Sequence, residues 1–180
     1  YYARARRLHA LAVQVSKPAI EGGFDGTIPG SIQQLLELPG IGEYTAAAVG
    51  SIAFDLHVGV VDGNVRRVAS RQTGNPNPTH DLVSIWANSM LIPGRPGDSN
   101  QAMMDLGAVI CKPKAPKCEL CPIFDSCEGK ENPLAYPAAT KRKKSIENLD
   151  AAVLLDPSGR PCLSRRDSSE RFGGMWGPPM

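Results

Sequence analysis

Four of the five cysteines in the chain lie within one short run, in the pattern Cys111-x6-Cys118-x2-Cys121-x5-Cys127. A run this tight, with a Cys-x2-Cys pair inside it, indicates metal ligation rather than disulfide bonding. Four thiolates on a turn-rich loop can hold an iron–sulfur cluster, and a structural zinc site with four cysteine ligands is the alternative. Zinc ribbons usually pair two Cys-x2-Cys knuckles, whereas this run has one. The spacing therefore favours an iron–sulfur cluster with a structural role.

A carboxylate, Asp62, stands between the apolar pair Val60-Val61 and the basic stretch 63–68. An aspartate at the start of a helix is commonly an N-cap, which is the simpler interpretation of this residue taken alone. The same position also favours an ionised carboxylate, which a residue that stabilises a cationic transition state must be. Both interpretations are open at this point.

The segment Leu38-Pro39-Gly40-Ile41-Gly42 joins two stretches that carry helical patterns. Its paired glycines permit positive φ angles and expose consecutive backbone N–H groups at the start of the second helix. Such groups, together with the helix dipole, bind phosphate. The segment therefore predicts a contact with the phosphates of the DNA backbone that does not depend on base sequence. A plain turn between two helices is the alternative interpretation.

The elements that must position these residues are helical in the first three-quarters of the chain, because apolar spacing and capping residues predict one helix after another. The expected helices cover residues 1–15, 31–38, 43–54, 63–72, 80–92 and 99–110, and Ser31, Asp62 and Asp98 would cap the second, fourth and sixth. No segment before residue 148 alternates as a strand does. From residue 151 onward the sequence predicts a strand, a turn and a second strand.

Composition excludes some classes of function. The net charge of +2 does not by itself indicate a nucleic-acid binder, although groups such as Arg4/Arg6/Arg7 and Arg66/Arg67/Arg71 could form a local basic face or ordinary solvated surface. The chain has no apolar stretch long enough to span a membrane. Clustered reduced cysteines fit an intracellular compartment. The sequence begins inside a predicted helix and ends just after a predicted strand, so we expect it to be truncated at both ends.

Taken together over residues 1–130, the hairpin, Asp62 and the cysteine run resemble the helix–hairpin–helix DNA glycosylases that carry a 4Fe–4S cluster. The stretches VDGNVRRV and NQAMMDLGAVICKPKAPKCELCP are similar to the adenine DNA glycosylase (MutY) family. That family removes adenine mispaired with 8-oxoguanine by hydrolysing the N-glycosidic bond. Endonuclease III carries a nucleophilic lysine after its hairpin, where this sequence has Tyr44. The difference favours a monofunctional adenine glycosylase.

The resemblance implies a role for each matching residue. Asp62 would stabilise the cationic sugar, and Asn64 and Tyr44 would position Asp62 and that sugar. The implied phosphate-binding backbone is Pro39, Gly40, Ile41 and Gly42, and the implied ligands of the 4Fe–4S cluster are Cys111, Cys118, Cys121 and Cys127. In the family the general acid is a glutamate that would lie upstream of Tyr1, so we expect this chain to lack it.

The resemblance also implies the organisation of the chain and its partners. Residues 1–56 would be part of a helical barrel domain with the hairpin, residues 57–130 a helical iron–sulfur domain, residues 131–148 a linker, and residues 149–180 the truncated start of a Nudix-like domain. The partner would be duplex DNA with A:8-oxoguanine or A:G mismatches, bound by a monomer without membrane association. We expect a nuclear location, with mitochondria as a second one.

Two other functions remain open at this stage. One is an endonuclease III-like bifunctional DNA glycosylase and abasic-site lyase. The other is a non-catalytic iron–sulfur module that binds DNA, which the presence of Asp62 argues against.

Overall fold

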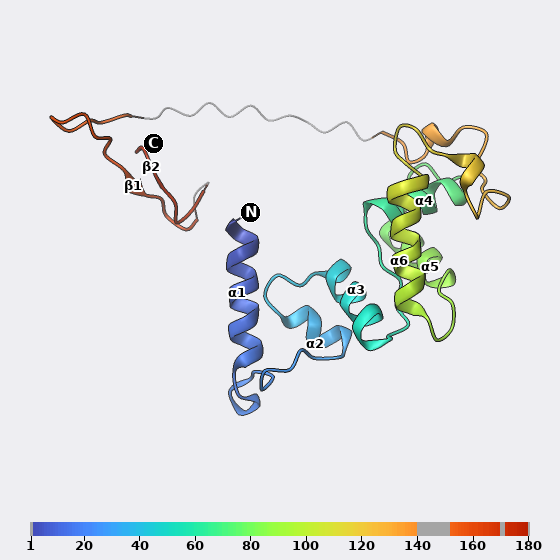
Figure 1. Cartoon of the computed structure of the whole chain (residues 1–180), viewed down its shortest axis with the longest axis horizontal. Helices are drawn as coiled ribbons and strands as arrows, with labels where there is room; N and C mark the ends of the chain where they lie inside the picture. The colour runs from blue at the N-terminus through green and yellow to red at the C-terminus, as the bar shows by residue number, and fades with distance from the viewer. Residues whose placement is uncertain (1, 140–151, 170–171, 180) are drawn as a thin grey trace. The chain divides into compact units, whose positions relative to one another are not determined.

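The structure is a computed structural model that describes residues 2–139, 152–169 and 172–179 (Figure 1). It divides into two compact units, Tyr1–Ala139 and Thr140–Met180. The basic run at residues 141–144 and the second half of the predicted linker lie outside the described residues.

The first unit is helical, as the apolar spacing predicts, and residues 2–139 contain no strand. Its α-helices are α1 (Tyr2–Ser16), α2 (Ile32–Glu37), α3 (Glu43–Phe54), α4 (Gly63–Gln72), α5 (His80–Ser89) and α6 (Pro96–Asp105). A π-helical turn, η2 (Leu106–Ile110), continues α6, and the short 3₁₀ turns are η1 (Ala19–Glu21), η3 (Cys118–Leu120) and η4 (Pro133–Ala135). No helix among the described residues is long and apolar enough to cross a membrane.

Local signals at the helix ends decide where most of these helices begin. The Ser31 hydroxyl caps α2 by accepting a hydrogen bond from the Gln34 N–H at 3.3 Å, as predicted. The predicted cap at Asp98 is wrong, because α6 already begins at Pro96, where proline supplies a helical φ without needing an acceptor for an N–H. Asp98 instead lies in the first turn and pairs with Arg95.

Two hydrophobic cores hold the first unit together. One joins α1, α2 and α3 through Val15, Leu35, Leu38 and Ala46. The other joins α4 and α5 through Val65, Ala69, Val83 and Ala87, with Met103 and Met104 of α6 packed against it. The segment that carries Asp62 runs from the first core to the second.

A buried asparagine fixes that segment. Asn100 of α6 is 3% exposed, and its Oδ1 accepts a hydrogen bond from the Val60 N–H at 2.9 Å. Its Nδ2 donates to the Val58 carbonyl and to the Ser51 hydroxyl of α3, each at 2.9 Å. A side chain with three satisfied bonds in a dry environment holds its partners in one geometry. Asn100 therefore connects α3 and α6 to the segment that precedes Asp62.

The second unit contains a small antiparallel pair, β1 (Ser164–Arg165) and β2 (Trp176–Gly177). An isolated bridge joins Leu155 and Pro161 across the predicted turn at residues 156–160. Within this turn Asp156 accepts hydrogen bonds from Ser158 and Arg160, which lower the pKa of its carboxyl group to about 2. The predicted turn is present and β1 lies within the second predicted strand, but residues 152–155 form no strand beyond the bridge at Leu155, and the sheet is too small to identify a domain.

Candidate functional site

The turn between α2 and α3 is held in one shape by a glycine. Gly40 has a φ of 82°, a region that favours glycine. A Cβ atom built on Gly40 would lie 2.8 Å from the Arg7 Cβ of α1. The Ile41 N–H donates to the Leu38 carbonyl at 3.1 Å and closes the turn. Both conformation and space therefore require glycine at this position.

Gly42 is the N-cap of α3 and differs from our expectation. Its φ of −108° is extended, so the predicted positive φ is wrong for this residue. No atom lies within 4 Å of a Cβ built on Gly42, and its N–H has no acceptor in the described part of the chain. The first N–H groups of a helix also lack intrahelical acceptors. The start of α3 thus presents open backbone donors at the positive end of the helix dipole, where an anion such as phosphate binds.

Asp62 is the N-cap of α4, as predicted, and both of its carboxylate oxygens are engaged. Oδ1 accepts from the Val65 N–H at 2.7 Å, and Oδ2 accepts from Nδ2 of Asn64 at 3.2 Å. The side chain is half-buried. The structure therefore brings Asn64 against Asp62, in the arrangement that its predicted positioning role requires.

Tyr44 lies in the first turn of α3, and its side chain is 46% exposed. Its hydroxyl lies 3.8 Å from the Met104 sulfur of α6. The described residues contain no hydrogen bond between Tyr44 and Asp62, so the role of Tyr44 toward the reacting sugar stays a prediction.

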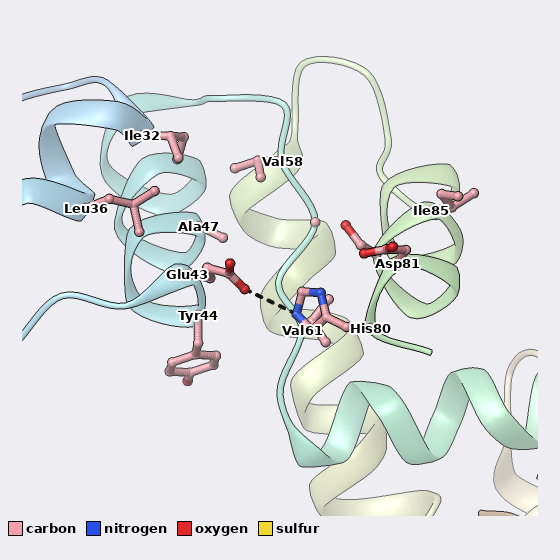
Figure 2. A pocket seen from close by; sticks show the side chains of 12 residues that line it. Ile32, Leu36, Glu43, Tyr44, Ala47, Val58, Val61, His80, Asp81 and Ile85 are labelled. Carbon is pink, nitrogen blue, oxygen red and sulfur yellow. Dashed lines mark ion pairs between the residues drawn. The ribbon is translucent and has the colours of Figure 1, made fainter. Parts of the chain in front are cut away.

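Tyr44 lines an open groove of about 410 Å³ between α3 and α5. In Figure 2 Glu43 of α3 points across this groove toward His80 of α5, and the two side chains approach to 3.5 Å. The groove also reaches Val61, the residue before Asp62. Sequence reasoning missed this groove, because it forms between helices that are distant along the chain.

The four clustered cysteines meet in space. Cys111, Cys118, Cys121 and Cys127 all line one cavity, together with apolar residues of α4 and η2 that include Val68, Leu106 and Ile110. Burial raises the pKa of the Cys118 thiol, and the neighbouring Cys111 and Cys121 raise it further. Burial likewise raises the pKa of Cys127. All four thiols are free of disulfide bonds.

The four thiols that line this cavity provide the number of thiolate ligands that a four-iron cluster needs. Among the described residues, no three His, Cys, Asp or Glu side chains converge closely enough to hold one metal ion. Zinc needs four ligand atoms about 2.3 Å from one centre, whereas a four-iron cluster takes its four thiolates around a larger body. Arg71 adds a positive charge at the thiols, since it is 2% exposed and its Nη1 lies 3.2 Å from the Cys111 sulfur.

A second arginine of α4 links the cysteine loop to Asp62. Arg67 Nη2 donates to Oδ1 of Asn64 at 3.0 Å, and Nε donates to the Cys111 carbonyl at 2.8 Å. Burial lowers the pKa of Arg67, and the nearby Cys111 opposes that shift. Arg67 and Arg71 therefore face the interior, which corrects the expectation that they belong to a basic surface cluster. Their spacing of four residues on the helix after Asp62 was the sequence signal for a shared face.

The comparisons with known proteins agree with this geometry. Residues 23–51 match the helix-hairpin-helix motif, and residues 111–127 match the iron-sulfur binding domain of endonuclease III. Among solved structures, a thermostable thymine-DNA glycosylase is 35% identical with a TM-score of 0.62, and covers 71% of this chain and 58% of its own. A trapped endonuclease III–DNA covalent intermediate is 25% identical with a TM-score of 0.59, over 72% and 59%. The chain has the mostly helical fold of the helix–hairpin–helix DNA glycosylases.

Sequence relatives narrow this class. The adenine DNA glycosylase of Rattus norvegicus is 40% identical over 171 residues, which are 89% of this chain and 32% of that protein. The human adenine DNA glycosylase is 44% identical over 136 residues, or 73% of this chain and 24% of that protein. The chain belongs to the adenine DNA glycosylase family, as predicted, and spans about a quarter to a third of the length of these curated relatives.

Proposed function

We propose that this chain is part of a base-excision-repair DNA glycosylase that removes adenine mispaired with 8-oxoguanine or guanine. The observation that carries the proposal is the placement of Asp62, whose carboxylate is held by donors from Val65 and Asn64 at the edge of the first unit's second core. Family membership supports the same reaction.

In the proposed reaction the adenine leaves the base stack before it is cleaved. The bond between C1′ of the sugar and N9 of adenine breaks, its electron pair goes to the base, and the base takes a proton. The Asp62 carboxylate stabilises the positive charge that develops on the sugar, and water then adds at C1′. Asn64 keeps Oδ2 of Asp62 in place through the 3.2 Å contact.

The proton donor is proposed to come from outside these 180 residues. Glu43, the glutamate that lines the groove beside Tyr44, is already engaged with His80. Its carboxylate points across the groove toward His80 (Figure 2).

Four residues would hold the 4Fe–4S cluster, namely Cys111, Cys118, Cys121 and Cys127. When bound, the cluster would supply a structural cross-link for the loop rather than chemistry on the sugar. Arg71 ties the same loop to α4 through a hydrogen bond to the Lys112 carbonyl, and it also donates to the Pro133 carbonyl of η4, each at 2.8 Å.

Recognition of duplex DNA is proposed to rest on the hairpin amides, which contact phosphate irrespective of base sequence. Recognition of 8-oxoguanine is proposed for a Nudix-like domain that begins near residue 149, and the organisation predicted for residues 1–56 and 57–130 is proposed with it. We also propose that the protein acts as a monomer in the nucleus.

The main alternative is a bifunctional glycosylase and lyase, which the likeness to endonuclease III supports. Tyr44 argues against it, because a phenol cannot form the Schiff base that a lysine forms. Borohydride reduction during the reaction of an A:8-oxoguanine duplex with a protein of the relatives' full length that carries this sequence separates the two. We expect free adenine and no covalent adduct, whereas a trapped protein–DNA adduct would favour the lyase.

A further inference from the structure

We propose that the groove between α1 and the hairpin turn is a second phosphate-binding surface, in which Arg4 and Arg7 hold the DNA strand that the hairpin grips. This inference rests on the proposed function, because it adds a contact to the same bound duplex. The groove has a volume of about 570 Å³, and the residues that matter to it are Arg4, Arg7, Leu8, Pro39, Gly40 and Thr45.

The charge of this groove is positive and uncompensated. Neither Arg4 nor Arg7 has a hydrogen bond or ion pair in the described part of the chain. Helix α1 contains no acidic residue, and no acidic residue lines the groove. Two like charges three residues apart on a helix repel each other slightly. A ligand that carries negative charge would relieve that repulsion.

Phosphate suits this pair of side chains. A guanidinium group presents a planar fork of N–H donors that binds phosphate oxygens in pairs and stays charged at any physiological pH. The apolar residues that line the groove, which include Leu8 and Pro39, offer little to a flexible acidic side chain. A continuous phosphate backbone, in contrast, can run along the rim from one arginine to the next.

The position of Arg7 links this surface to the hairpin. Its Cβ would contact a Cβ at Gly40 at 2.8 Å, so the base of the arginine side chain lies directly on the turn. Gly42, whose N–H is open, is two residues further along the same turn. A strand held by the α3 amides therefore passes next to α1, and the two arginines extend the contact to neighbouring phosphates.

The test is the salt dependence of duplex binding by the wild-type chain and the double variant Arg4→Gln/Arg7→Gln. Each phosphate contact contributes about 0.9 to the slope of log affinity against log salt. We expect the variant slope to be shallower by about 1.8, so its affinity deficit shrinks about tenfold between about 50 and 200 mM salt. Arg6→Gln is the control, because it removes one positive charge from the same helix outside the groove, and we expect its slope to match the wild type.

Phosphate-ethylation interference gives a second readout that does not depend on affinity. We expect ethylation of the phosphates next to the hairpin contact to weaken binding by the wild-type chain. The same ethylation is expected to have no effect on binding by the double variant. An unchanged slope and footprint in the double variant, with wild-type binding intact, would overturn this inference alone. An equal change in Arg6→Gln would overturn it as well, since the effect would then be one of net charge. A wild-type chain that binds no duplex would overturn the proposed function with it.

Discussion

Arg67 stands one helical turn beyond Asn64 on α4 and donates a hydrogen bond to its side-chain oxygen at 3.0 Å. Through Asn64 the arginine reaches Asp62, and through its Nε it reaches the Cys111 carbonyl. One partly buried guanidinium therefore connects the carboxylate at the start of α4 with the loop that carries the four cysteines. The order of the cysteine loop and the position of Asp62 depend on the same side chain.

Replacing Arg67 tests this connection. In a protein of the relatives' full length that carries this sequence, we expect Arg67→Gln to reduce the single-turnover rate of adenine excision about tenfold, because Asn64 loses the partner that fixes its amide and Asp62 becomes mobile. Loss of the hydrogen bonds of this partly buried side chain also lowers the free energy of unfolding by about 2 kcal/mol. The matched control is Arg66→Gln, since Arg66 bonds the Pro78 carbonyl instead. Equal excision rates for both variants would show that Arg67 has no part in positioning Asp62.

Cysteine substitutions separate cluster ligands from the remaining thiol. Cys118→Ala is expected to lose bound iron and to disorder residues 111–127, because the cavity then lacks one of its four thiolates. Cys162→Ala is the control, since Cys162 is exposed in the second unit. Iron and sulfide analysis of anaerobically purified protein measures the difference, with about four irons per chain expected when all ligands are present. Full iron content in Cys118→Ala, or stoichiometric zinc in the wild type, contradicts the assignment.

Substitutions of the two hairpin glycines, Gly40 and Gly42, are expected to affect different properties, namely the stability of the fold and the affinity for duplex DNA. Gly42→Val fits the free protein, because space around Gly42 is open, and costs about 1 kcal/mol as a poorer N-cap. It would obstruct the approach of phosphate and weaken binding to any duplex about tenfold. Gly40→Val would instead destabilise the fold, since Gly40 has a positive φ and lies against Arg7. Thermal melts and duplex titrations distinguish the two effects. Altered mismatch preference without weaker binding in Gly42→Val would contradict the hairpin role.

Replacing Asn100 is expected to lower the free energy of unfolding more than replacing its exposed neighbour Gln101. Asn100→Ala leaves the buried Val60 N–H and Val58 carbonyl without their partner, which costs about 2–4 kcal/mol in the free energy of unfolding. Gln101→Ala removes a hydrogen bond to Gly97 on the surface and is expected to cost under about 1 kcal/mol. Chemical denaturation compares them, and similar losses would show that the link between α6 and the Asp62 segment is not strong.

The sequence predicted best what depends on neighbouring residues. The caps at Ser31 and Asp62 follow from one side chain and an N–H three residues on. The prediction of a cap at Asp98 was wrong because the helix begins at Pro96, three residues before the predicted start at residue 99. The inward direction of Arg67 and Arg71 was not predictable from local pattern, because their acceptors lie on a loop that is some 40 residues away along the chain.

In the candidate site, too, the sequence predicted the features that depend on neighbouring residues and not those that depend on contacts between distant helices. Cysteine spacing and the run around Asp62 indicated the cluster and the carboxylate before any geometry was known. The contact between Tyr44 and Met104 and the groove lined by Glu43 and His80 depend on how α3, α5 and α6 pack. Such contacts arise between elements distant in sequence, and a pattern of residue types does not specify their distances.

The proposed role of the Asp62 carboxylate is to stabilise the cationic sugar. Asp62→Asn keeps the N-cap acceptor for Val65, although the new amide meets a donor at Asn64, so we expect a loss of about 1 kcal/mol in the free energy of unfolding. Duplex affinity is expected to stay close to that of the wild type, because the hairpin is unchanged.

The most direct measurement is the single-turnover rate of adenine excision opposite 8-oxoguanine, made in a protein of the relatives' full length that carries this sequence. At saturating protein, we expect Asp62→Asn to be at least about a hundredfold slower than the wild type, since a neutral amide does not stabilise the developing positive charge. Excision by Asp62→Asn at the wild-type rate would contradict the account and remove Asp62 from the mechanism.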